Sequence, residues 1–307
     1  MLNRNFVILT VTIAVVFTVL AQANTQEVNG PDRASENKSI TLTNKMNLRG
    51  LNLYGRRFVA GSEPVADVNF SNARLKYAFL PFDYEELPPI TTFKNCNFRE
   101  AVMNHTFVGE AVVFVDCDFT DAIINDAQIN LSPKNLAQTR SYKQRDLRGV
   151  KMGDCWWAAE RETPPSFDFS NCNLKNATLP RGLCNCKFDN AIIEDTTFNS
   201  HGYPLRVEQL YSTKSYKQGT IINCAFGNFD FTNANFANVN LTGSSFNSCD
   251  FKNAKMDDAI ISRCRFPSAK NLVLAQIKST WNYKHNRMDG IVLPKDTQDE
   301  LDKEKKK

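Results

Sequence analysis

Two adjacent tryptophans form the clearest candidate for binding chemistry in this sequence. Trp156 and Trp157 are followed closely by Glu160 and Glu162. Aromatic rings stack on sugar rings, and carboxylates accept hydrogen bonds from hydroxyls, so this group indicates a carbohydrate-binding platform. Alternatively, the indoles pack their segment against the rest of the fold. Successive side chains of an extended segment point to opposite sides, so the two rings cannot both face one ligand, and packing is the favoured interpretation.

A second candidate is a motif that occurs three times, with the pattern Leu-x4-Leu/Ile-x2-Thr-x2-Tyr-Lys. The copies begin at Leu131, Leu205 and Leu272, and their tyrosines are Tyr142, Tyr216 and Tyr283. One interpretation is a triplicated Thr-Tyr-Lys surface site. We favour the other, in which Leu and Tyr close the core where the main pattern is interrupted. Ser132-Pro133 is typical of a helix start, which predicts a short helix or helical turn in each copy.

The sequence offers little for catalysis or metal binding. It contains three histidines, His105, His201 and His285, and no serine or cysteine lies within a known nucleophile signature. A glycine-rich phosphate loop, a zinc-protease motif and a calcium loop are all absent from the sequence. Cys184 and Cys186 are close in sequence, but no histidine is near them. We therefore expect a protein that is not an enzyme and has no cofactor and no metal site.

The elements that would position these residues come from a repeat of five. A large apolar residue stands at every fifth position in one long stretch: Ile221, Phe226, Phe231, Phe236, Leu241, Phe246, Phe251, Met256, Ile261 and Phe266. This period fits neither a helix nor a plain strand, and it indicates a solenoid of short stacked segments. A small residue such as Ala234 usually stands two positions earlier, and we expect the exception, Phe229, to bulge its coil.

The five-residue units resemble those of the pentapeptide-repeat family. Examples are Ala234-Asn235-Phe236-Ala237-Asn238, Cys249-Asp250-Phe251-Lys252-Asn253 and Cys172-Asn173-Leu174-Lys175-Asn176. The resemblance covers most of residues 45–292 and implies an all-β fold. That fold is a right-handed, four-sided parallel β-helix with one unit per side, here with a few short helical interruptions. The central residue and the small residue before it would point inward.

Nine cysteines in an exported chain would ordinarily suggest disulfides. Seven of them fall in the inward small-residue position, where a free thiol behaves as a compact apolar group. These are Cys96, Cys117, Cys172, Cys186, Cys224, Cys249 and Cys264. Buried thiols are therefore favoured over disulfides. The sequence leaves open whether Cys96 pairs with Cys117, or Cys155 with Cys184.

The two ends of the chain differ from its middle. Residues 1–23 read as a cleavable signal peptide, with Arg4 before an apolar run and a cut predicted after Ala23. Export to the periplasm or beyond the cell is therefore expected, with no membrane span after cleavage. Residues 24–44 are predicted to be a flexible linker, 45–294 the β-helix, and 295–307 a disordered charged tail.

These features favour a non-catalytic exported solenoid that serves as a protein-interaction or structural scaffold for an unidentified protein or envelope partner. Carbohydrate or cell-wall binding through the loop aromatics is the alternative. Some members of the family mimic DNA and bind topoisomerases. That function is least favoured here, because the net charge of +4 gives neither a strongly acidic face nor a basic footprint for nucleic acid. The sequence does not indicate an oligomeric state or how the ends are capped.

Overall fold

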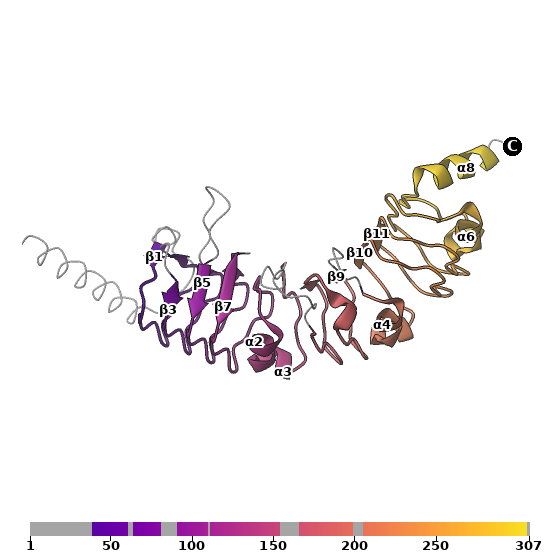
Figure 1. Ribbon diagram of the computed structural model, residues 1–307. Helices are drawn as coiled ribbons and strands as arrows, with labels where there is room; N and C mark the ends of the chain where they lie inside the picture. The colour runs from indigo at the N-terminus through magenta and orange to yellow at the C-terminus, as the bar shows by residue number, and fades with distance from the viewer. Residues whose placement is uncertain are drawn as a thin grey trace, which may run out of the picture.

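In the computed structural model the chain winds into coils that stack along one long axis, with helix α8 at the C-terminal end (Figure 1). The structure describes residues 39–60, 64–80, 91–109, 111–153, 166–198 and 205–305. The predicted signal peptide and most of the predicted linker lie outside these residues. Among the described residues, no helix combines the length and the apolar character needed to cross a bilayer.

Short strands from successive coils pair side by side. The strands are β1 (Ser39–Thr41), β2 (Arg57–Val59), β3 (Val65–Ala66), β4 (Phe79–Leu80), β5 (Thr91–Lys94), β6 (Phe107–Val108), β7 (Val112–Val115), β8 (Thr178–Leu179), β9 (Thr197–Phe198), β10 (Ala225–Gly227) and β11 (Ser245–Asn247). These strands pair in parallel, in the orders β1-β2-β4-β6, β3-β5-β7 and β11-β10-β9-β8. In the most regular part Asn235 pairs with Lys255 and Asn240 with Ile260, so one coil takes 20 residues. The chain is therefore a parallel β-helix.

From Ile221 to Phe266 a corner follows every central apolar residue. In the regular stretch the residues with positive φ stand five apart: Asn223, Asn228, Asn233, Asn238, Gly243, Ser248, Asn253, Asp258, Arg263 and Ser268. Asn, Asp and Gly adopt this left-handed conformation most readily, which explains their frequency there. The polar residue before the central position also stabilises the corner, because its side chain accepts the N–H two residues later. Asn235 accepts from Ala237 at 3.1 Å, and Asp250 accepts from Lys252 at 2.9 Å.

The column of large apolar residues forms the core. Phe231, Phe236 and Phe251 are each at most 1% exposed, as the five-residue period predicts. Rings from successive coils lie almost parallel. The centroids of Phe226 and Phe246 are 5.5 Å apart, and those of Phe246 and Phe266 are 5.2 Å apart. These separations are close to the spacing of about 4.8 Å between paired strands, so ring stacking and backbone pairing reinforce each other.

The prediction of a bulge at Phe229 is wrong. The side chain is buried and packs against Phe226 and Phe231, with centroids 5.3 Å and 5.8 Å away. The ladder keeps its register beside it, since the N–H of Asp250 donates to the carbonyl of Phe229 at 2.9 Å. The interior therefore accepts an aromatic ring in this small-residue position without a change in coil length.

Short helices interrupt the coils. They form three pairs: α2 (Pro133–Gln138) with α3 (Arg140–Lys143), α4 (Val207–Ser212) with α5 (Lys214–Lys217), and α6 (Leu274–Ser279) with α7 (Trp281–Lys284). A 3₁₀ turn, η2 (Leu183–Asn185), also occurs. Each pair coincides with one copy of the Leu-Thr-Tyr-Lys motif, so the expected single helical element is a pair. Ser132 caps α2 by accepting the N–H of Asn135 at 3.1 Å, with Pro133 in the first turn, as its sequence predicts.

Both ends of the β-helix differ from the expected boundaries. Strand β1 pairs with β2, Ile40 opposite Phe58, so the coils begin before residue 45. The segment expected to be a disordered tail forms helix α8 (Lys295–Lys305). Leu301 is 2% exposed, and the Thr297 hydroxyl donates to the carbonyl of Leu272 at 2.6 Å. One apolar side chain and one buried hydroxyl thus dock a highly charged segment onto the last coil.

Candidate functional site

The predicted tryptophan platform cannot be placed. Trp156, Trp157, Glu160 and Glu162 all lie outside the residues that the structure describes. The three tyrosines of the repeated motif, Tyr142, Tyr216 and Tyr283, are described and lie far apart along the chain, one in each helix pair. Each is partly buried against the core. They do not form one site together.

The threonine of each motif copy has a structural role. Thr139, Thr213 and Thr280 are at most 1% exposed and stand between the two helices of their pair. Each side-chain oxygen accepts the N–H of the motif tyrosine, at 3.1–3.3 Å. Each hydroxyl donates to a carbonyl of the preceding helix, at 2.6–2.8 Å. The one donor of each hydroxyl and one of its acceptor lone pairs are thus used inside the fold.

The tyrosines and lysines of the motif tie neighbouring coils together. The Tyr142 hydroxyl donates to the carbonyl of Asp168 at 2.7 Å, and that of Tyr216 to the carbonyl of Asn235 at 2.6 Å. Burial raises the pKa of Tyr216 to about 12, so its phenol keeps the proton that this bond requires.

The lysines point the other way, to the corner of the preceding coil. Lys143, Lys217 and Lys284 reach Asp121, Asn190 and Asp258 at 2.8–2.9 Å. All three acceptors are corner residues with positive φ.

The residue before each tyrosine was missed by the sequence reasoning. It is Ser141, Ser215 or Asn282, and it is at most 2% exposed. Its side chain accepts the N–H of a central residue in the preceding coil: Ile124 and Ile193 at 3.0 Å, and Ile261 at 2.7 Å. In a regular coil a backbone carbonyl of the next coil would accept that N–H. Where a helix pair takes the place of the strand, the Ser or Asn side chain accepts the N–H instead of that carbonyl. These contacts support the core-closing interpretation of the motif over a surface site.

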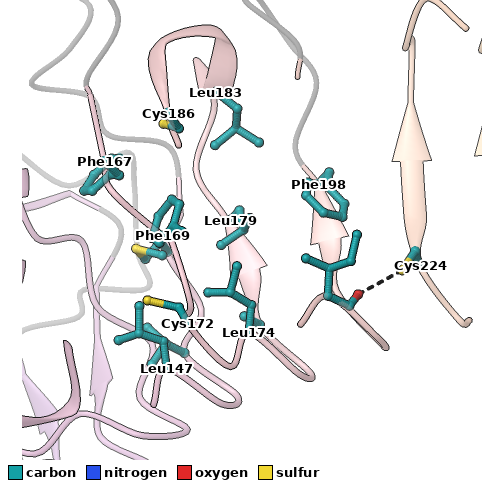
Figure 2. Close-up of a cluster of buried hydrophobic side chains, with 14 of the residues drawn as sticks. Leu147, Phe167, Phe169, Cys172, Leu174, Leu179, Leu183, Cys186, Phe198 and Cys224 are labelled. Atoms are coloured by element: carbon teal, nitrogen blue, oxygen red, sulfur yellow. Dashed lines mark hydrogen bonds between the residues drawn. The ribbon is translucent and has the colours of Figure 1, made fainter. Parts of the chain in front are cut away.

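The described cysteines are all free, and seven occupy the interior as predicted. Figure 2 shows Cys172 and Cys186 among the large apolar side chains of neighbouring coils. Burial raises the pKa of Cys186, Cys224, Cys249 and Cys264 to about 12. The Cys224 thiol donates to the carbonyl of Ile193 at 2.9 Å, the contact dashed in Figure 2. Protonated, buried thiols are poor nucleophiles and poor metal ligands.

The two candidate disulfides have different outcomes. Cys96 and Cys117 are not bonded. They stand in neighbouring coils next to the paired residues Asn97 and Asp118. A hydrogen bond between the two thiols lowers the pKa of Cys96 and raises that of Cys117. Cys184 is a free, partly exposed thiol, and Cys155 lies outside the described residues.

A partly open cavity lies on the described surface. It has a volume of about 300 Å³ and lies between β7 and the start of α2. Its lining combines Phe114 and Val115 of the strand with Asn130, Lys134 and Asn135 on the opposite side. A volume of this order accommodates a small ligand or a few residues of peptide. Across the described ranges, no three His, Cys, Asp or Glu side chains come together as a metal site would require.

Comparison with protein-family models finds eight copies of the pentapeptide repeat in residues 226–266. These are the residues with the strict five-residue corner spacing described above. Residues 226–266 of this chain are pentapeptide repeats.

Two solved structures are similar to this chain. HetL, a pentapeptide-repeat protein involved in regulating heterocyst differentiation in the cyanobacterium Nostoc, is 14% identical, with a TM-score of 0.26 over 83% of this chain and 85% of HetL. A trypsin-treated form of QnrB1, a plasmid-mediated fluoroquinolone resistance protein, is 13% identical, with a TM-score of 0.24 over 87% of this chain and 97% of QnrB1. No curated protein matches the sequence.

Proposed function

We propose that this pentapeptide-repeat protein is an exported, non-catalytic scaffold that presents the long faces of its solenoid to a protein or envelope partner. The observation that carries the proposal is how the polar side chains are used. In the described residues, the motif threonines, tyrosines, lysines and the Ser/Asn before them bond to the fold itself. A chain that devotes these groups to its own rigidity is suited to display a surface.

The proposal includes a right-handed, four-sided tube as the shape of that scaffold. Four corners at five-residue spacing fit one 20-residue coil, which supports the four sides. Export is proposed from residues 1–23 alone, which have the order of charge, apolar run and small residues of a signal peptide. The near-neutral net charge of +4 disfavours mimicry of a nucleic acid.

An interaction capture tests the scaffold role. The chain from residue 24 onward would be immobilised and exposed to the envelope fraction of its own cell. A Phe246→Asp variant serves as control, because a buried charge at this fully buried position disrupts the coils. Retention of the same protein by the intact chain and not by the variant is expected. If the two chains retain the same material, the scaffold role is wrong.

Cell fractionation tests export separately. The full-length chain is expected in the envelope or extracellular fraction, shortened at its N-terminus. A chain that lacks residues 1–23 is expected to stay in the cytoplasm. Full-length protein found uncleaved in the cytoplasm would refute export and leave the scaffold proposal to be judged by the capture experiment.

A further inference from the structure

Strand β7 ends a sheet inside the solenoid rather than at its end. The order β3-β5-β7 stops there, because the chain that follows the next corner forms α2 instead of another strand. Its sequence, Val112-Val113-Phe114-Val115, is made entirely of strong strand formers, and Val115 is 38% exposed. A sheet edge of this composition is a template on which another extended segment can pair.

The backbone of β7 keeps an unused donor at this edge. In regular coils the N–H of the central residue donates to the next coil, as Phe98 does to Asp118 at 2.7 Å. Where α2 and α3 intervene, side chains substitute, and the N–H of Phe119 donates to Gln138 Oε1 at 2.7 Å. For the N–H of Phe114, no acceptor is found in the described part of the chain. Only its carbonyl is engaged, by Asn135 Nδ2 at 3.4 Å.

The third motif copy shows what fits such an edge. There the chain lays an extended segment on the preceding coil before α6 begins at Leu274. Lys270 makes both backbone hydrogen bonds of one parallel pairing between coils, which we call a rung. Its N–H donates to the carbonyl of Cys249 at 2.8 Å, and its carbonyl accepts from the N–H of Phe251 at 2.9 Å. In the first copy α2 begins only four residues after the central residue Ile129. That connection is too short to supply the same rung, and the cavity of about 300 Å³ lies in its place.

We propose that this cavity binds an extended peptide segment of a partner protein, which adds one parallel rung to β7. By analogy with Lys270, one peptide residue would donate its N–H to the carbonyl of Val112 and accept the N–H of Phe114. A small apolar side chain would face the interior beside Phe114, because alanines in the small-residue position, such as Ala234 and Ala259, are buried elsewhere in the solenoid. Backbone pairing of this kind gives affinity, and the flanking side chains select the sequence. The inference rests on the proposed scaffold role and gives it a defined contact.

A synthetic peptide with the sequence of residues 267–272, Pro-Ser-Ala-Lys-Asn-Leu, blocked at both ends, is the probe. Titration into the isotopically labelled chain is expected to shift the amide signals of Phe114 and Asp116 at millimolar concentration. The control peptide carries a methyl group on the backbone nitrogen of its lysine. This removes the N–H that would donate to the carbonyl of Val112. Loss of this hydrogen bond should weaken binding about tenfold. Equal binding of the two peptides, or no shift at either amide, would overturn the inference.

A matched pair of variants locates the site. Lys134→Trp fills the cavity from its exposed rim and should abolish the shifts, whereas Glu208→Trp, at the corresponding position of α4, should not. In the free chain the Phe114 amide should exchange with deuterium at least about tenfold faster than that of Phe98. Protection equal to that of Phe98 would mean that the edge is already covered, and would refute the proposal. If the envelope capture succeeds and is unchanged by Lys134→Trp, the peptide site is wrong and the scaffold role stands.

Discussion

Replacing Asn282 by alanine should destabilise the last coils far more than an ordinary surface change. Its side chain is fully buried and makes three hydrogen bonds. It accepts the N–H of Ile261 at 2.7 Å and donates to Ser262 Oγ and to the carbonyl of Arg287, both at 2.9 Å. Alanine removes all three and leaves the buried N–H of Ile261 without an acceptor.

The magnitude follows from that count. A buried donor left unsatisfied costs about 1–3 kcal/mol, and each of the other bonds contributes about 0.5–1.5 kcal/mol. The free energy of unfolding should therefore fall by about 2–6 kcal/mol. Asn240→Ala is the matched control. Asn240 is only partly buried, and its backbone contact is a single corner bond to the N–H of Thr242 at 3.0 Å. That change should cost about 1 kcal/mol or less.

Urea denaturation would compare the two variants with the original chain. Because a solenoid can unfold in parts, amide hydrogen exchange at Ile261 should accompany it. Faster exchange at Ile261 in Asn282→Ala, with little change in Asn240→Ala, is the expected result. Equal losses of stability in the two variants would refute the assignment of Ser141, Ser215 and Asn282 as replacements for a strand carbonyl.

Three further results are expected. Phe246→Ala should lower the free energy of unfolding by about 3–5 kcal/mol in urea denaturation, because the ring is fully buried between Phe226 and Phe266; a loss below about 1 kcal/mol would contradict the stacked core. Leu301→Ala should release α8 and cost about 2–3 kcal/mol, seen as faster amide exchange throughout 295–305, whereas unchanged exchange would show that the helix does not depend on this contact. Stability should fall as the pH rises above about 9. Folding raises the pKa of Cys224, Cys249 and Cys264 from an ordinary value of 9.0 to about 12, so the unfolded chain releases protons that the folded chain retains. Unfolding curves at pH 8 and pH 10.5 that coincide would disprove this prediction.

The core could be predicted from the sequence because burial in this fold depends on position within a unit. Large residues at every fifth position, and cysteines two places before them, identified the inward side chains without knowledge of the coil path. Ser132-Pro133 likewise identified a helix start, since a cap acts on its own neighbours. Contacts within a few residues and a strict period can therefore be predicted directly from the sequence.

The remaining features depend on neighbouring coils, and the sequence does not state where those lie. The Ser141 hydroxyl accepts from a residue 17 positions earlier, and that pairing exists only once α3 replaces a strand. The charged composition of 295–305 concealed α8, because docking depends chiefly on Leu301 and Thr297. The edge of β7 was equally hidden. It arises from a missing rung, which no local pattern records.

The helix pairs follow a rule that is counted in coils and not in residues. One ladder runs unbroken through Gln128, Lys151, Thr178, Thr197, Ala225, Ser245, Arg265 and Val292. A helix pair precedes the rungs at Lys151, Ala225 and Val292, so each of these rungs is the third after the one before it. The motif tyrosines are nevertheless unequally spaced in sequence. The spacing in sequence is uneven because coils vary in length. The position of a pair is instead fixed by its neighbours, since Tyr142 bonds to Asp168 in the following coil and Lys143 to Asp121 in the preceding coil. At about 4.8 Å per coil the pairs stand about 14 Å apart, a regular array that the uneven sequence spacing conceals.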